Sequence, residues 1–80
     1  MTRPFTPKDY LILDLLAGQK QPQSAMAIAK ELFGVPNGQL VAGSIRVLED
    51  CGFTTSQVDG ISGLRRYVIS RKGRQALKMR

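Results

Sequence analysis

The chain has 80 residues, a net charge of +6, no histidine and a single cysteine. This length allows one small domain with a modest hydrophobic core, so we expect residues 1–80 to form a single domain. A lone cysteine cannot close an internal disulfide, and without histidine no Cys/His cluster can bind a metal. No apolar run is long enough for a signal peptide or a membrane span. We therefore expect a cytoplasmic protein with no metal, no cofactor and no membrane contact.

The charged residues are distributed unevenly along the chain. All acidic residues precede Gly60, whereas most of the basic residues follow it, namely Arg65, Arg66, Arg71, Lys72, Arg74, Lys78 and Arg80. Basic groups that contact phosphates release condensed counterions, so an acid-free basic segment is typical of a phosphate-binding face. A solvated basic surface without a partner is the alternative that charge alone leaves open.

The first helix is predicted from Pro7 to Gly18. Thr6 is a suitable N-cap, proline is favoured at the first helical position, and Asp9 carries a negative charge in the first turn. A broad apolar surface follows, which we expect to be largely buried: Tyr10, Leu11, Ile12, Leu13, Leu15 and Leu16.

Two further helices are predicted close together. The second covers residues 25–33, with Ser24 as N-cap and Gly34 as terminator. Only two residues then precede Asn37, which can cap a third helix over about residues 38–50. A turn of three or four residues between two helices is the spacing of a helix-turn-helix.

The third predicted helix has one apolar face and one slim, mostly neutral face. Its apolar stripe consists of Val41, Ile45 and Leu48, widened by Leu40, Ser44, Val47 and Cys51. The opposite face consists of Gln39, Ala42, Gly43, Arg46, Glu49 and Asp50. A face this slim fits a major groove about 12 Å wide. Because a glycine inside a helix costs about 1 kcal/mol relative to alanine, Gly43 indicates close approach to a neighbouring helix or to nucleic acid.

After Gly52 the pattern changes from helical to alternating. Residues 53–58 and 65–69 are predicted to be the two strands of a hairpin, which places Arg65 and Arg66 on opposite faces of the second strand. Ser70 can then cap a last short helix over residues 71–78. The predicted fold is therefore α+β, a winged helix-turn-helix with three helices, a two-stranded β-wing and a short C-terminal helix.

Two motifs, residues 45–53 and residues 66–77, resemble winged-helix transcriptional regulators of the PadR and MarR kind, and the match is closest to PadR. Ile45-Arg46-Val47-Leu48-Glu49 with Gly52-Phe53 resembles the apolar-Arg-x-Leu-Glu-x-x-Gly-apolar signature. Residues 66–77 are similar to the family's wing strand and its Leu-Thr-x-x-Gly-Arg-x-Ala-Leu close. The chain has Val41-Ala42-Gly43 where PadR proteins usually have Leu-Tyr-Pro. It also lacks the dimerisation helix that usually follows the wing, so we expect a different homodimer, a monomer or a place in a larger assembly.

The resemblance implies that residues 38–50 form a recognition helix for double-stranded DNA and that residues 53–70 form the wing. Base-contact candidates are Asn37, Gln39, Ala42, Gly43 and Arg46. Arg65 and Arg66 are candidates for minor-groove or phosphate contacts from the wing. Arg71, Lys72 and Arg74 are candidates for contacts to the DNA backbone. As an alternative, Arg46 pairs with Glu49 or Asp50 one turn away and has no role in binding.

A sequence-specific DNA-binding regulator, repressing or activating according to its operator, is the leading hypothesis. One alternative is a small architectural factor such as a phage excisionase, which would bend DNA cooperatively. Another is a winged helix that binds a protein partner through an apolar wing and exposed Leu40 or Val47. An enzyme is not expected, because no residues of the chain supply a nucleophile together with a base.

Overall fold

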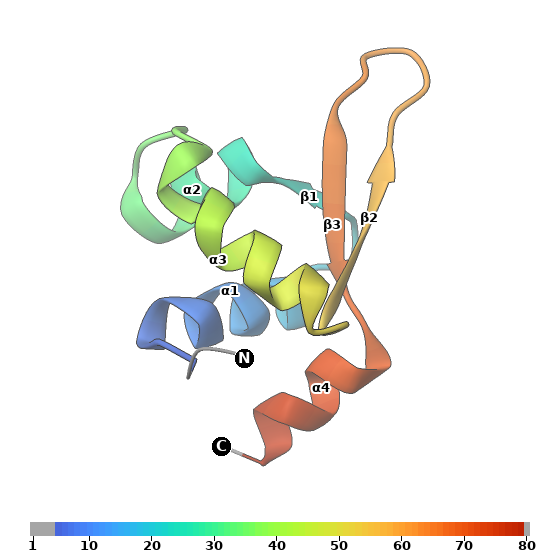
Figure 1. Ribbon diagram of the computed structural model, residues 1–80. Coiled ribbons are helices and arrows are strands. Elements are labelled where there is room, and N and C mark those ends of the chain that lie inside the picture. The colour runs from blue at the N-terminus through green and yellow to red at the C-terminus, as the bar shows by residue number, and fades with distance from the viewer. Residues whose placement is uncertain (1–4, 80) are drawn as a thin grey trace.

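The computed structural model describes residues 5–79 of the chain. Its helices are α1 (Pro7–Gly18), α2 (Ala25–Phe33), α3 (Gln39–Asp50) and α4 (Arg71–Lys78). Its strands are β1 (Gln23–Ser24), β2 (Thr54–Val58) and β3 (Arg65–Ile69). Helices α1, α2 and α3 form a compact group, the β2–β3 hairpin projects beyond it, and α4 lies at the opposite end from the hairpin tip (Figure 1). The predicted α+β winged helix-turn-helix is confirmed.

The hydrophobic core lies between the first three helices. Its buried members are Ile12, Leu13, Leu16, Ile28, Ala29, Val41, Ile45 and Leu48. The stripe predicted for the third helix is therefore confirmed. The apolar surface of the first helix was expected to be largely buried, and Ile12, Leu13 and Leu16 are, but Leu11 is 48 % exposed. A helix packed against neighbours on one side buries a stripe and leaves the opposite side in solvent.

Side-chain caps define the starts of the helices. Thr6 and Asp9 form a capping box, in which the Thr6 amide donates to Asp9 Oδ2 at 2.9 Å and the Asp9 amide donates to Thr6 Oγ1 at 3.3 Å. Ser24 accepts from the Ala27 amide at 3.1 Å. The predicted cap of the third helix was off by one residue: the N-cap of α3 is Gly38, and Asn37 Oδ1 accepts from the Gln39 amide at 3.1 Å just before it. These bonds satisfy amides that lack a partner within their helices.

The sheet has three strands in the order β1-β3-β2, one strand more than the predicted hairpin. In β1, Gln23 pairs with Tyr67 and Ser24 pairs with Arg66, and both pairs are antiparallel. Two residues are too few to show an alternating pattern, and their partner lies far along the chain, which is why the sequence gives no sign of this strand. The extra strand ties Arg66 and Tyr67 of β3 to the start of α2.

The junction between α3 and β2 is held by backbone contacts. Gly52 has a φ of 79°, which ends α3 and turns the chain, and the Phe53 amide donates to the Leu48 carbonyl at 2.9 Å. From the far end of the hairpin, the Ser70 amide donates to the Phe53 carbonyl at 2.9 Å, and Ser70 Oγ donates to the Gly52 carbonyl at 2.6 Å. The two ends of the wing are thus fastened to each other and to the end of α3.

Two helical glycines differ sharply in their surroundings. A Cβ atom at Gly73 in α4 would overlap the Phe53 carbonyl oxygen and lie 2.8 Å from Ile69 Cγ1. At Gly43 in α3, a Cβ atom would meet nothing within 4 Å. The expectation that Gly43 lies close to a neighbouring helix was wrong. Such an approach occurs instead at Gly38, where a Cβ would lie 3.1 Å from the Ala25 Cβ.

We predict that Gly73→Ala destabilises the fold and that Gly43→Ala stabilises it. The first change forces α4 away from the Phe53 carbonyl and should cost about 1–3 kcal/mol or more. The second adds a better helix former in open space and should add about 1 kcal/mol. Urea denaturation of both variants checks the pair, with m-values compared to the unchanged protein. A shift of both variants in the same direction would contradict this account of the two sites.

Candidate nucleic-acid interface

The exposed face of α3 carries the residues predicted for base contact. Gln39, Ala42, Gly43 and Arg46 are exposed, because the stripe Val41, Ile45 and Leu48 is buried on the other side of the helix. Asn37 is also exposed and lies just before the helix. The five candidates therefore share one accessible region, which extends from just before α3 to Arg46.

A groove of about 320 Å³ lies between α3 and β3. It is lined by Ala25, Ala42, Ile45, Arg46, Glu49, Asp50, Arg65 and Tyr67. Arg65 faces this groove because it shares a face of β3 with Tyr67 and Ile69, which pack against the helical core. The structure thus brings together Arg46 of the third helix and Arg65 of the wing, which are far apart in the sequence.

Within residues 5–79, neither arginine of the groove forms an ion pair, although the carboxylates of Glu49 and Asp50 also line the groove. No ion pair joins Arg46 to Glu49 or Asp50, all three of which lie in the described part of the chain, so the alternative of an intrahelical pair is not seen. Arg65 donates from Nη1 to Ser56 Oγ on the neighbouring strand at 2.9 Å. This bond orients the guanidinium without neutralising it, which leaves the positive charge available to an anion.

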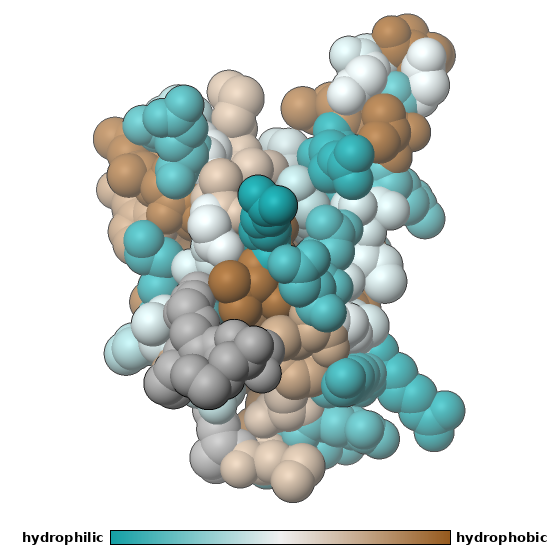
Figure 2. Space-filling view, viewed as in Figure 1, coloured by the Kyte–Doolittle hydropathy of each residue, from teal (hydrophilic) through white to brown (hydrophobic). Residues whose placement is uncertain are grey.

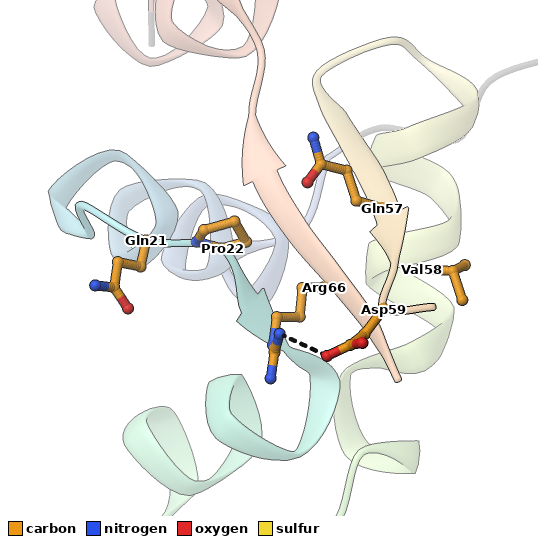
Figure 3. Close-up of a pocket in the computed structure, with 6 residues that line it drawn as sticks. All are labelled: Gln21, Pro22, Gln57, Val58, Asp59 and Arg66. Carbon is orange, nitrogen blue, oxygen red and sulfur yellow. Dashed lines mark hydrogen bonds and ion pairs between the residues drawn. The ribbon is translucent and has the colours of Figure 1, made fainter. Parts of the chain in front are cut away.

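Arg66 is on the other face of β3 and has an acidic partner. Its Nη1 lies 3.5 Å from Asp59 Oδ2, and Figure 3 shows the two side chains pointing toward each other. They line a pocket of about 380 Å³ together with Gln21, Pro22, Gln57 and Val58. The sequence pattern did not reveal this pair, because the hairpin loop must close before the two residues meet.

The loop at the tip of the wing is closed around Asp59. Its Oδ1 accepts from the amides of Ile61 at 2.8 Å and Ser62 at 3.4 Å, and its own amide donates to the Leu64 carbonyl at 2.9 Å. The bond from the Ile61 amide, then that from Ser62, and to a smaller degree the charge of Arg66 hold the pKa of the Asp59 carboxyl below its usual value. The ionised carboxylate of Asp59 therefore stabilises the turn.

The basic residues of α4 lie away from this groove. Arg71, Lys72 and Arg74 are exposed on a helix at the opposite end of the molecule from the wing tip (Figure 1). Lys72 Nζ lies 5.4 Å from the centre of the Phe53 ring, a cation–π contact at the base of the wing. Their role in binding the DNA backbone stays a prediction, and the structure does not bring them together with Arg46 and Arg65.

Within residues 5–79, no helix is long and apolar enough to cross a membrane. The same residues contain no group of three or more Cys, Asp or Glu side chains that could hold a metal ion.

Solved structures with the same fold are transcriptional regulators. A complex of Staphylococcus aureus MepR with DNA has a TM-score of 0.78 and 22% sequence identity, covering 94% of this chain and 60% of that chain. A MarR-family regulator from Rhodococcus sp. RHA1 has a TM-score of 0.79 and 17% sequence identity, covering 94% of this chain and 51% of that chain. The transcriptional regulator Tm0710 from Thermotoga maritima has a TM-score of 0.75 and 27% sequence identity, covering 91% of this chain and 50% of that chain. No protein-family model matches the chain, and no curated protein is detectably similar in sequence.

These comparisons establish the winged-helix fold of MarR-type regulators for this chain. The chain spans about half the length of the structures that it matches. The MarR side of the predicted resemblance is supported, whereas a closer relation to PadR stays a prediction.

We predict that the wing loop loosens in acid. Because the pKa of folded Asp59 is lowered, its contribution to stability is complete above the ordinary value of 3.8 and is lost as the pH falls through the folded pKa. The Ile61 amide proton should therefore shift in NMR spectra with a midpoint below 3.8. Asp59→Asn, which keeps the acceptor oxygen but does not titrate, is the control and should show no such shift. A midpoint at or above the ordinary value would contradict the assignment.

Proposed function

We propose that this protein is a sequence-specific DNA-binding transcriptional regulator. The recognition helix, about residues 38–50, enters the major groove, and the wing, residues 53–70, lies on the flanking groove and backbone. One observation carries this proposal: Arg46 and Arg65 come from different elements, line one groove and have no acidic partner. The fold shared with regulators, including one solved in complex with DNA, supports the same conclusion.

The exposed residues of α3 fit direct readout of bases. Arg46 can donate two hydrogen bonds to guanine O6 and N7, Gln39 can pair with adenine N6 and N7, and the Ala42 methyl can contact a thymine methyl. Asn37 uses Oδ1 for its cap, so its amide nitrogen remains to donate to DNA. Because Gly43 has no side chain, the backbone of α3 can come closer to the DNA at this position.

The basic residues outside α3 fit contacts that position the protein on the duplex. Arg65 already faces the groove beside α3, whereas Arg66 must exchange Asp59 for a phosphate. Arg71, Lys72 and Arg74 would reach the backbone only of DNA that extends past the base of the wing. We therefore rank Arg65 above Arg66 and both above the residues of α4.

The finer parts of the hypothesis belong to the same proposal. We propose a cytoplasmic protein that is not an enzyme, needs no cofactor and is related to PadR regulators. It binds DNA as a homodimer or together with a protein partner, since operators often mirror the two-fold symmetry of their proteins.

A protein-binding winged helix is the second candidate. Exposed Leu40 on α3 and exposed Val58 and Leu64 on the wing favour it, because exposed apolar side chains often meet a partner. Val47, which was expected to be exposed with Leu40, is half-buried. The double variant Arg46→Ala, Arg65→Ala separates the two functions. It should abolish DNA binding under our proposal and leave partner binding intact under the second candidate. Cooperative bending, in which several copies of the protein bind side by side and bend the DNA together, would instead favour an architectural factor of the excisionase type.

We predict different effects of Arg46→Ala and Arg66→Ala on DNA binding. The first should cost about 1–3 kcal/mol and relax base preference at one position, because it removes a base contact. The second should weaken binding to all sequences by a similar factor. It should also make the slope of log K against log salt concentration about one unit less steep, because one phosphate contact is lost. Both are measured by titration against random and genomic duplexes at two salt concentrations.

The unchanged protein is the reference for that titration. If it shows no salt-dependent binding to any duplex, the proposed function fails. If the two variants behave alike, the protein binds DNA but the assignment of α3 to the major groove is wrong.

We also predict that Gly43→Ala weakens DNA binding at least about tenfold, equivalent to about 1.4 kcal/mol. The added methyl group meets no protein atom within 4 Å, so any loss must come from the bound DNA. Fluorescence anisotropy with the preferred duplex measures the effect. Gly18→Ala, which also adds a methyl group in open space but on α1, is the control and should leave binding unchanged. Unchanged binding would show that the low surface at Gly43 has no part in recognition.

A further inference from the structure

The tip of the wing is apolar. Val58 is 55 % exposed, Leu64 is 38 % exposed, and Ile61 is fully exposed at 100 %. Figure 2 shows apolar side chains at this tip, which projects beyond the helices. Full burial of an isoleucine side chain is worth about 1.5–3 kcal/mol, and Ile61 contributes none of it to this fold.

The loop that carries Ile61 is nevertheless well built. The Ile61 amide is held by Asp59 Oδ1, the Gly63 amide donates to the Asp59 carbonyl at 2.8 Å, and the Leu64 amide donates to Ser62 Oγ at 3.2 Å. Gly63 has a φ of 72°, which allows the turn to close. The isoleucine is therefore presented outward by an ordered turn, and little entropy would be lost when it binds.

We propose that Ile61 is an apolar wedge that enters the minor groove of DNA beside the site of α3 and unstacks a base step there. The inference rests on the proposed function. A minor groove about 6 Å wide admits a single side chain, and isoleucine is among the residues that proteins insert between base pairs. Pyrimidine–purine steps are the easiest to open, so the wedge would add a preference for such a step and bend the duplex.

The charges next to the tip favour DNA over a protein partner. Arg65 and Arg66 follow the loop on opposite faces of β3, so they flank the wedge as phosphates of the two strands flank a minor groove. The carboxylate of Asp59 keeps its hydrogen bonds from the turn amides when Arg66 exchanges it for a phosphate. A stable protein interface needs roughly 800 Å² on each partner, far more than three aliphatic side chains at a hairpin tip can offer.

The test uses a short duplex selected from a random pool for binding to the protein. It carries 2-aminopurine at a TA step in the flank and a fluorophore pair at its ends. The unchanged protein should raise the 2-aminopurine fluorescence and bend the duplex. Ile61→Ala should lose both signals and bind about three- to tenfold more weakly with the same salt slope, since no phosphate contact is removed. Ile61→Leu keeps a wedge and should retain both signals.

The outcomes separate this inference from the proposed function. Salt-dependent binding by the unchanged protein without unstacking or bending would overturn the wedge and leave the DNA-binding function standing. Failure to bind any duplex would remove both. If Ile61→Ala leaves both DNA signals unchanged but abolishes self-association in analytical ultracentrifugation, the tip is a contact between copies of the protein and the wedge is wrong.

Discussion

The arrangement of this protein depends on the backbone junction at Gly52 and Phe53. There the end of α3 and both ends of the hairpin meet through the carbonyls of Leu48, Gly52 and Phe53. Because these bonds join the end of α3 to both ends of the hairpin, they limit the freedom of the wing to tilt. Gly73 belongs to the same constraint, because only a residue without a side chain lets α4 lie against the Phe53 carbonyl.

This junction decides which charges can act together. With the wing fixed beside α3, Arg65 faces the helix and shares a groove with Arg46, while Arg66 turns outward to Asp59. The basic residues of α4 lie at the far end of the molecule, although they are close to the wing in the sequence. The acid-free segment that first suggested a single phosphate-binding face is therefore divided among three separate surfaces.

Local signals predicted most of the elements correctly. The capping residues Thr6 and Ser24 and the left-handed Gly34 mark helix ends within a few residues, because caps satisfy amides and carbonyls of the adjacent turn. Strand β1 and the pair of Arg66 with Asp59 escaped prediction, since both need partners that only the folded chain brings close. The open space at Gly43 was likewise invisible, because sequence cannot tell which neighbour a glycine faces.

The sequence by itself determined the kind of fold and the face of α3 that remains exposed. Both follow from periodicity and caps, which act over a few residues and do not depend on distant parts of the chain. Only the tertiary structure decided that Arg46 and Arg65 line one groove, that Arg66 is paired, and that Ile61 stands alone at the wing tip. Those facts depend on the orientation of the hairpin against α3, which long-range hydrogen bonds and packing set.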